Sequence, residues 1–315
     1  MQNEKLPLII IAGPTAVGKT SISIEVAKKI NGEIISADSM QVYKYMDIGT
    51  AKISKEEMNG IKHYLIDEVT PDEDFSVSDF QTKANEYINL IYNNGKLPIV
   101  VGGTGLYINS LVYDLDFTQA VSNWKLREEY QDKARRFGNQ YIHNELKKVD
   151  IESACRIHVN DTKRIIRALE VYYETGKPMS YFYRNFRKEN KKFNIIYYCL
   201  NMNRDKLYDR INNRVDDMLE KGLIDEVKNL LNMGYSENLV SMQGLGYKEI
   251  IQYLKGNCSL DEAIEILKRN SRRFAKRQLT WFRREERVHW IDVDSYDNKK
   301  QLVDYIIKDI KEKLY

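Results

Sequence analysis

The sequence predicts an α/β fold, with a parallel sheet flanked by helices and an inserted helical subdomain. Three observations support this prediction: an apolar strand that runs into a glycine-rich turn, the alternation of such strands with helical segments, and a long central stretch without strands. The 315 residues suffice for roughly two domains of about 100–200 residues each.

The first part of the chain alternates between strands and helices. Residues 8–12 form a wholly apolar run closed by Gly13 and Pro14, which is typical of a buried parallel strand. Apolar residues then recur at helical spacing over 20–30. Further strands are predicted at 33–37 and 97–101, with a helix between them at 80–92. This order predicts a parallel sheet.

The pattern changes near Phe117. Residues 117–192 are rich in Arg, Lys and Tyr and contain no clear strand, so we expect an inserted helical subdomain. Phe193–Leu200 predicts a strand that returns to the sheet, 204–287 is helical, and 288–293 predicts a last strand. The core domain would therefore comprise residues 1–116 and 193–315.

Composition excludes several protein classes. With 43% hydrophobic and 30% charged residues, the chain is neither disordered nor collagen-like. No apolar run approaches the roughly 18 residues of a membrane span, and the N-terminal residues show no signal peptide. Three widely spaced cysteines without a CxxC pair indicate a reducing cytoplasm and no zinc site.

Charge is distributed unevenly along the chain. Residues 1–120 contain 10 Lys, no Arg and 16 acidic residues, so every arginine lies in 121–315. Residues 268–287 alone hold nine basic and two acidic residues, and helical projection predicts a basic face there. A solvated surface is one explanation, but a nearly unbroken basic stripe favours a nucleic-acid backbone.

A phosphate-binding motif follows the first strand. The motif GxxxxGK[ST] is matched by Gly13, Pro14, Thr15, Ala16, Val17, Gly18, Lys19 and Thr20. Its backbone N–H groups and the following helix N-terminus attract phosphate; Lys19 would neutralise the outer phosphate and Thr20 would reach Mg²⁺. We therefore predict a P-loop NTPase-like sheet, although the motif does not identify the phosphate ester.

Two further strand ends carry polar groups. Asp38 follows the second strand, where it could act as a base on an acceptor or cap a helix with Gln41 at the third position. After the strand at 97–101, the turn Gly102–Gly105 stands where many P-loop NTPases carry an acid, and Asp67 is a weak substitute. This disfavours a mechanical ATPase and favours a small-group transferase or a kinase.

Arg210 and Arg214 share one helix face. They could close on a phosphate, or they could pair with neighbouring acids such as Asp209, Asp216 and Asp217.

The motifs together resemble those of the tRNA dimethylallyltransferase family. The matching segments span nearly the whole chain in order: 13–20 (GPTAVGKT), 38–43 (DSMQVY), 48–52 (IGTAK), 102–107 (GGTGLY), 164–171 (RIIRALEV), 175–178 (TGKP), 246–249 (GYKE) and 276–283 (KRQLTWFR).

The resemblance implies transfer of a dimethylallyl group from dimethylallyl diphosphate to N6 of the adenosine at tRNA position 37, beside the anticodon. It implies that the P-loop holds the donor diphosphate and not ATP, with Mg²⁺ as cofactor. Asp38 matches the family's general base, Thr104 the residue near the bridging oxygen of the donor, and Arg214 a diphosphate-binding arginine. A cytoplasmic monomer with no membrane attachment is expected.

The resemblance also implies a set of tRNA contacts from three segments and two single positions. These residues are Asp38, Ser39, Met40, Gln41, Thr104, Arg127, Lys163, Arg164, Ile165, Ile166, Arg167, Lys276, Arg277, Gln278, Trp281 and Arg283.

Three alternatives share parts of this pattern. A P-loop small-molecule kinase would use Asp38 on a hydroxyl, but it has no use for the basic helix. Prenyl transfer to free AMP would keep the donor site. A nucleotide-gated RNA-binding protein would use the basic helix without covalent chemistry.

Overall fold

The computed structural model describes residues 5–113, 115, 123–184 and 188–314. The chain divides into two compact units, one of Met1–Leu111 with Lys191–Tyr315 and one of Val112–Asn190. The boundaries expected from the sequence, 117 and 192, lie a few residues further along the chain in both cases.

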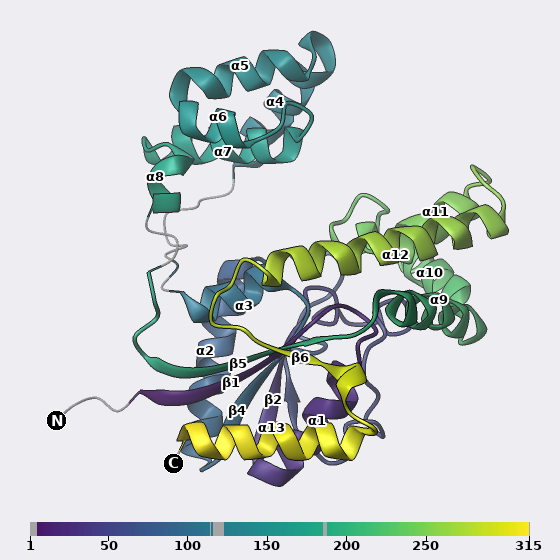
Figure 1. Cartoon of the computed structure of the whole chain (residues 1–315). Helices are drawn as coiled ribbons and strands as arrows, with labels where there is room; N and C mark the ends of the chain where they lie inside the picture. Colours follow the sequence, from purple (N-terminus) through teal and green to yellow (C-terminus); the bar gives the residue numbers. More distant parts are fainter. Residues whose placement is uncertain (1–4, 114, 116–122, 185–187, 315) are drawn as a thin grey trace. The chain divides into compact units, whose positions relative to one another are not determined.

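The first unit is built on one six-stranded sheet, in which all neighbouring strands are parallel (Figure 1). The order is β3-β2-β4-β1-β5-β6. The strands are β1 (Leu6–Ala12), β2 (Gly32–Ala37), β3 (His63–Tyr64), β4 (Leu97–Gly102), β5 (Phe193–Asn201) and β6 (His289–Asp292). The predicted α/β fold class is confirmed, and β3 is the strand that the sequence did not reveal.

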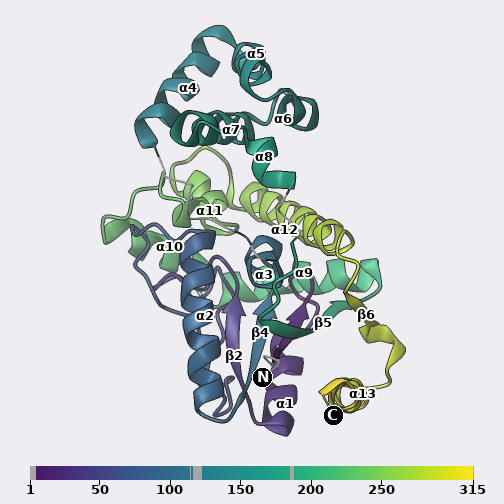
Figure 2. The same cartoon turned by 90° about the vertical axis from the view of Figure 1, so that its left-hand side faces the viewer.

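Helices cover both faces of this sheet. Ile9 and Ile11 of β1 pack with Ile22 of α1 (Lys19–Ile30) and Ile306 of α13 (Lys299–Leu314). Because side chains alternate along a strand, the intervening residue Ile10, which is fully buried, faces the other side. That side carries α2 (Val77–Asn93) and α3 (Gly105–Val112), and Figure 2 shows the sheet between α2 and the pair α1 and α13. The sequence did not predict α13.

The strand register aligns three chain segments at one edge of the sheet. Gly102 of β4 lies between Ala12 of β1 and Ala37 of β2. A Cβ atom on Gly102 would lie 2.1 Å from the Ala37 carbonyl oxygen, so only glycine fits there. The loops that continue from these strands therefore begin side by side, at the edge where open α/β sheets bind ligands.

A second hydrophobic cluster joins the helices after β5 to the segment after β2. The helices are α9 (Arg204–Glu220), α10 (Leu223–Asn232), a 3₁₀ turn (Ser241–Gln243), α11 (Tyr247–Leu254) and α12 (Leu260–Phe282). Val42 and Met46 pack there with Val227 and Leu267. The long helix α12 reaches the main core as well, through Ala275.

Helix α12 is shorter than the sequence predicted. The predicted helical segment continued to 287, but α12 ends at Phe282. After it, Arg284 and Glu285 donate their N–H groups to Trp281 and Phe282 in tight turns. The chain has to reverse here because β6 begins at His289, and a 3₁₀ turn (Val293–Ser295) then leads to α13.

The second unit is helical. Its helices are α4 (Trp124–Phe137), α5 (Asn139–Val149), α6 (Ile151–Arg156), α7 (Thr162–Thr175) and α8 (Met179–Arg184). Tyr130, Ile142, Leu146 and Leu169 form its core. Part of the predicted insertion, 117–122 and 185–187, lies outside the described residues.

One carboxylate in the first unit holds the loop that follows β2. Glu226, near the start of α10, accepts hydrogen bonds from the N–H groups of Asp47 (2.8 Å), Ile48 (2.7 Å) and Gly49 (3.0 Å). It also accepts the hydroxyl of Tyr247 on α11 at 2.7 Å. An ionised acceptor strengthens each of these bonds, so Glu226 ties the loop to two helices.

We therefore expect Glu226→Gln to lower the free energy of unfolding by about 1–3 kcal/mol, because a neutral amide cannot accept all four bonds. Urea unfolding of the intact chain, followed by circular dichroism, measures the change. Asp225→Asn is the matched control, since this neighbour is exposed and forms an ion pair with Lys228 at 3.5 Å; the variant should change stability by less than about 1 kcal/mol. If both variants lost the same free energy of unfolding, the proposed role of Glu226 in holding the loop would be contradicted.

Candidate functional site

Two adjoining cavities lie at the edge where the strand ends meet. Their volumes are about 240 Å³ and 310 Å³. Five residues line both of them: Thr15, Asp38, Thr50, Arg214 and Phe274. A molecule bound in one cavity would thus meet a molecule bound in the other at these residues.

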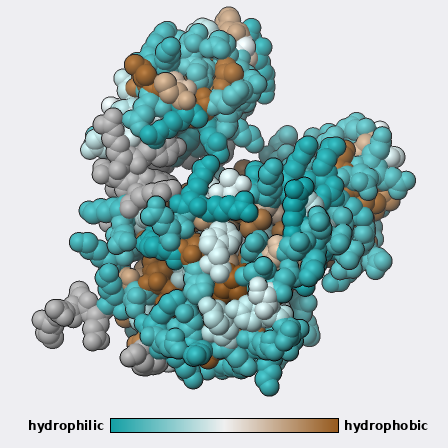
Figure 3. Space-filling view, viewed as in Figure 1, coloured by the Kyte–Doolittle hydropathy of each residue, from teal (hydrophilic) through white to brown (hydrophobic). Residues whose placement is uncertain are grey.

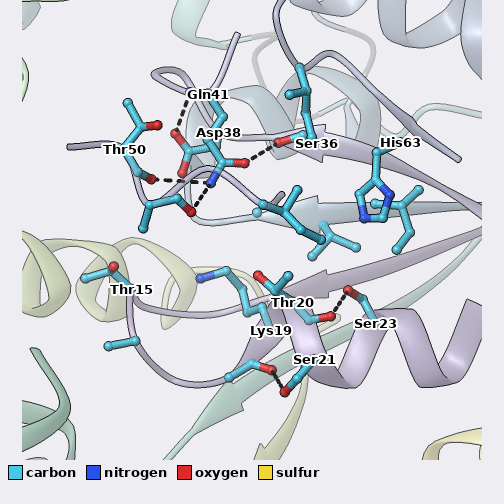
Figure 4. A pocket seen from close by; sticks show the side chains of 18 of the residues that line it. Thr15, Lys19, Thr20, Ser21, Ser23, Ser36, Asp38, Gln41, Thr50 and His63 are labelled. Atoms are coloured by element: carbon cyan, nitrogen blue, oxygen red, sulfur yellow. Dashed lines mark hydrogen bonds between the residues drawn. The ribbon is translucent and has the colours of Figure 1, made fainter. Parts of the chain in front are cut away.

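The P-loop forms one wall of the first cavity. Figure 4 shows Lys19 and Thr20 on one side of this cavity, with Asp38, Gln41 and Thr50 on the opposite side. The loop needs glycine at Gly18, whose φ is +102°, because the chain takes a left-handed conformation just before α1 begins. The N-terminus of α1 therefore points its unpaired N–H groups and its positive dipole end at the cavity.

Lys19 is held against the P-loop and has an unusual acidity. Its ammonium group donates to the carbonyl oxygens of Gly13 (3.0 Å) and Pro14 (2.8 Å). Burial, together with the nearby positive charge of Arg214, lowers the pKa of Lys19 to about 8. Burial also lowers the pKa of Arg214. Two cations held close together in a partly buried cavity favour an anionic ligand.

Helix α9 contributes both of the arginines singled out in the sequence. Arg214 Nη1 donates to Thr15 Oγ1 at 3.2 Å and lines both cavities. Arg210 Nη1 lies 3.9 Å from the position that a Cβ atom on Gly18 would take. Arg214 therefore lies beside Thr15 of the P-loop, and Arg210 lies beside Gly18.

Asp38 closes a turn and does not cap a helix. Its Oδ1 accepts the N–H groups of Met40 (2.9 Å) and Gln41 (3.4 Å), but the residues that follow, 39–42, form turns and not a helix. Its Oδ2 makes no hydrogen bond with any residue that the structure describes. One carboxylate oxygen is therefore held by the backbone while the other is available at the junction of the cavities.

Thr104 and a set of apolar side chains line the second cavity. Thr104 Oγ1 accepts the N–H of Ser39 at 3.1 Å, which joins the Gly102–Gly105 turn to the loop after β2. The apolar lining comes from α9, α12, the loop after β2 and the loop before α11: Ile211, Val215, Met218, Leu267, Phe274, Met40 and Leu245. Such a cavity suits a flat or apolar group with a few polar contacts.

The implied Mg²⁺ ion would have few protein ligands. In the described part of the chain, no group of three or more His, Cys, Asp or Glu side chains is placed to hold a metal. Thr20, which is exposed and lines the first cavity, offers a hydroxyl oxygen. Mg²⁺ commonly keeps several waters and binds substrate phosphates, so Thr20 fits as one ligand beside a bound phosphate. Asp67, the weak alternative acid, instead pairs with Lys52 at 2.6 Å.

The basic face of α12 is smaller than the projection predicted. Four cations on the helix are exposed (Arg269, Arg273, Lys276 and Arg277), as are Arg283 and Arg284 just after it. Figure 3 shows the surface over α12 as largely hydrophilic. Among the basic residues of 268–287, Lys268 pairs with Asp216, Arg272 bonds to Asn212, and Arg287 pairs with Glu285.

Two predicted tRNA contacts on this segment point inward. Gln278 is 7% exposed, and Trp281 is partly buried against Gly105, where a Cβ atom would lie 2.2 Å from the indole ring. Their side chains pack within the first unit and are not part of the exposed basic face.

The predicted contacts in the second unit also divide into two groups. Lys163 and Arg164 are exposed, whereas Ile165 and Ile166 are buried in the core, where their side chains cannot face a partner. Arg127 and Arg167 both bind Glu170, the first through Nε at 2.8 Å and Nη2 at 3.0 Å. The Arg127 guanidinium also lies over the ring of Trp124, 4.6 Å from its centroid.

Glu170 is fully buried. Although burial alone would raise its pKa, hydrogen bonds from Arg127 and Arg167 hold the pKa of this carboxyl below its ordinary value. The two arginines are therefore ordered by an acid that the sequence analysis did not single out.

Sequence reasoning missed Phe274 and the structural position of Gln278. Both lie on α12, four residues apart, and both line the first cavity. The sequence did contain an indication, because Gln278 is an uncharged amide on the apolar side of the basic segment 268–287. Its partners, however, lie near residues 15 and 103 and cannot be deduced from helical spacing.

Comparison with known proteins gives a consistent result. A sequence model described as IPP transferase matches residues 41–285. The chain is 57% identical over 296 residues to a tRNA dimethylallyltransferase of Acetivibrio thermocellus, covering 94% of this chain and 95% of that protein. It is 55% identical over 311 residues to the enzyme of the same name from Clostridioides difficile, with 99% of each chain covered.

Solved structures agree with these matches. A tRNA isopentenylpyrophosphate transferase from Bacillus halodurans is 46% identical with a TM-score of 0.72, covering 98% of both chains. A eukaryotic dimethylallyltransferase described as acting on tRNA is 34% identical with a TM-score of 0.77, covering 91% of this chain and 74% of that one.

The acidity of Lys19 leads to a pH prediction for phosphate binding. Methyl diphosphate should bind about tenfold more weakly at pH 9 than at pH 7, because Lys19 loses its proton above about pH 8 in the free protein. A bound anion raises the pKa of Lys19, so binding above pH 8 should take up a proton. Isothermal titration calorimetry in buffers of different ionisation enthalpy measures both effects.

Lys19→Arg is the control, since a guanidinium stays charged throughout this range. The affinity of this variant should vary little between pH 7 and 9. If the affinity of the wild type also varied little between pH 7 and 9, the lowered pKa of Lys19 would be contradicted.

Proposed function

The chain belongs to the IPP transferase family of enzymes that transfer a prenyl group to tRNA, and from this we propose that it moves a dimethylallyl group from dimethylallyl diphosphate to N6 of adenosine 37, next to the anticodon. One observation carries the proposal: a cavity lined by the P-loop and its cations adjoins a second cavity with apolar walls, and Asp38 lies in the lining of both.

The first cavity suits the diphosphate of the donor. The backbone N–H groups of the P-loop and the start of α1 would receive the phosphate oxygens. Lys19 and Arg214 would neutralise the charge that grows on the diphosphate as it leaves. Arg210, beside Gly18, would add positive potential at the outer end of the loop. This use of the P-loop requires no ATP.

The second cavity suits the adenine. The base would have to leave the stack of the anticodon loop to enter it, at a cost of a few kcal/mol. The apolar side chains of the lining, Phe274 among them, would replace some of the lost stacking. Phosphate contacts from the exposed cations of α12, which are sensitive to salt, would offset the rest.

The reaction forms a C–N bond and breaks a C–O bond. The N6 amine is a poor nucleophile because its lone pair is delocalised into the ring. As N6 attacks the allylic carbon, Asp38 Oδ2 would accept the N6 proton, and the diphosphate would leave with the electron pair of the C–O bond. Thr104 would position the loop of Asp38 through its bond to Ser39. Mg²⁺, held by Thr20 and the diphosphate, would supply further positive charge.

The remaining features agree with an enzyme of the cytoplasm. No helix in the described part of the chain has the length and apolar character that a membrane span requires. The three cysteines are unpaired, as is usual in a reducing compartment.

Label transfer tests the proposed reaction directly. Purified protein and Mg²⁺ would be incubated with prenyl-labelled dimethylallyl diphosphate and unmodified tRNA, or with the same tRNA carrying guanosine at position 37. We expect label only in the tRNA with adenosine 37. Parallel reactions would replace the tRNA with AMP, or the donor with γ-labelled ATP. Label in AMP alone would refute the tRNA substrate, and transfer from ATP alone would indicate a kinase.

The role of Asp38 leads to a second prediction. In Asp38→Asn the side-chain oxygen can still accept the N–H groups of Met40 and Gln41, but it cannot take a proton. We expect kcat to fall about 10²- to 10⁴-fold while the affinity for an anticodon stem–loop changes less than about twofold. Single-turnover kinetics and filter binding measure the two quantities.

Asp72→Asn, at an exposed carboxylate that does not line either cavity, is the matched control and should leave both quantities unchanged. If Asp38→Asn kept more than about a tenth of the wild-type kcat, another group would have to be the base.

A further inference from the structure

Helix α12 contacts the P-loop through the amide of Gln278. Gln278 Oε1 accepts the N–H of Thr15 at 2.9 Å, and Nε2 donates to the carbonyl oxygen of Gly103 at 3.0 Å. A single side chain therefore joins α12 to the P-loop and to the turn after β4. Both ends of the amide are used, so the side chain has little freedom to rotate.

The turn after β4 has glycine at the two positions where α12 packs closely against it. A Cβ atom on Gly103 would lie 2.1 Å from Gln278 Nε2, and one on Gly105 would lie 2.2 Å from Trp281. Larger residues at either position would push the helix away. The close approach at Gln278 is therefore repeated one helical turn further on, at Trp281.

Thr15 is held from two sides. Gln278 Oε1 accepts a hydrogen bond from the Thr15 N–H, and Arg214 Nη1 donates one to the Thr15 hydroxyl at 3.2 Å. Thr15 also lines both cavities. A shift of Gln278 would thus change the P-loop at a point that the donor and the acceptor share.

The same part of α12 carries the exposed cations. Lys276 and Arg277 are exposed within one turn of Gln278, and Arg273 is exposed about one and a half turns away. Arg277 also lines the second cavity. On the inner side of the helix, Ala275 is fully buried in the main core, and Leu279 packs against the same core. An RNA phosphate bound on the outer face would restrain the helix segment whose inner face holds Thr15.

We propose that Gln278 is a positioning residue that couples tRNA binding on α12 to the geometry of the P-loop. In this assignment Gln278 does not contact tRNA, and each substrate strengthens the binding of the other. This coupling must be reciprocal, because it is a difference in binding free energy. The inference rests on the proposed function of the two sites.

The test measures the coupling in the full-length protein. The donor probe is dimethylallyl thiolodiphosphate, in which sulfur replaces the bridging oxygen to resist cleavage. Its Kd would be measured with and without a saturating anticodon stem–loop. In the wild type we expect the stem–loop to lower this Kd at least about fivefold. In Gln278→Met, of similar size but without an amide, this ratio should fall to about one.

Two further readouts separate positioning from direct contact. The Kd of the stem–loop alone should change less than about twofold in Gln278→Met, and a saturating donor probe, which lowers this Kd in the wild type, should no longer lower it in the variant. Lys276→Gln is the matched control on the outer face: it should weaken stem–loop binding and retain the wild-type coupling ratio. Weaker stem–loop binding with an unchanged ratio in Gln278→Met would overturn the inference and identify Gln278 as a tRNA contact.

A wild-type ratio of one, with both probes bound, would also overturn the inference. Failure of the wild type to bind the probe or the stem–loop would instead refute the proposed function. If Gln278→Met lost its near-ultraviolet circular dichroism signal, Gln278→Glu would replace it. The ionised side chain can accept from Thr15 but cannot donate to Gly103, so an intermediate ratio is expected, and a wild-type ratio would overturn the inference.

Discussion

The site depends on the hydrogen-bond register of three parallel strands. Ala12, Gly102 and Ala37 lie side by side in β1, β4 and β2. The chain leaves these strands as the P-loop, the turn of Gly103 and the loop of Asp38. Thr104 then donates its N–H to the Ala37 carbonyl oxygen at 3.1 Å, which continues the pairing beyond the sheet. Without this register, Lys19 of the P-loop and the proposed base would not face the same cavity.

The electrostatics of the site are arranged before any ligand binds. Burial lowers the pKa of both Lys19 and Arg214, and the positive charge of Arg214 lowers the pKa of Lys19 further. Asp38 favours the charged form of both cations, yet it forms no direct ion pair with either of them. A bound polyanion such as the proposed diphosphate would offset the unfavourable energy of holding two cations in a buried site. In the proposed reaction, positive charge placed in this way would act on the leaving diphosphate without reorganisation of the site.

The sequence revealed those parts of the fold that depend on local pattern. Apolar runs and glycine turns predicted β1, α1 and β4 within a few residues. The two-residue strand β3 has no periodicity, and α13 was overlooked although its apolar residues pack against α1. The end of α12 depends on where β6 begins, which no helical pattern encodes. Long-range pairing likewise decides that Arg127 binds Glu170 and that Gln278 reaches Thr15.

Asp38 shows why the structural and chemical roles of one side chain can be separated. Two backbone N–H groups hold Oδ1, and backbone groups cannot rotate away as side chains can. The orientation of Oδ2 therefore follows from the turn itself, and the turn follows from the end of β2. Ser39, the next residue, is bonded to Thr104, so the position of the carboxylate is determined by the two neighbouring strand ends. If Asp38 is the base, as proposed, it needs no further acidic partner, and its single available oxygen lies where the two cavities meet.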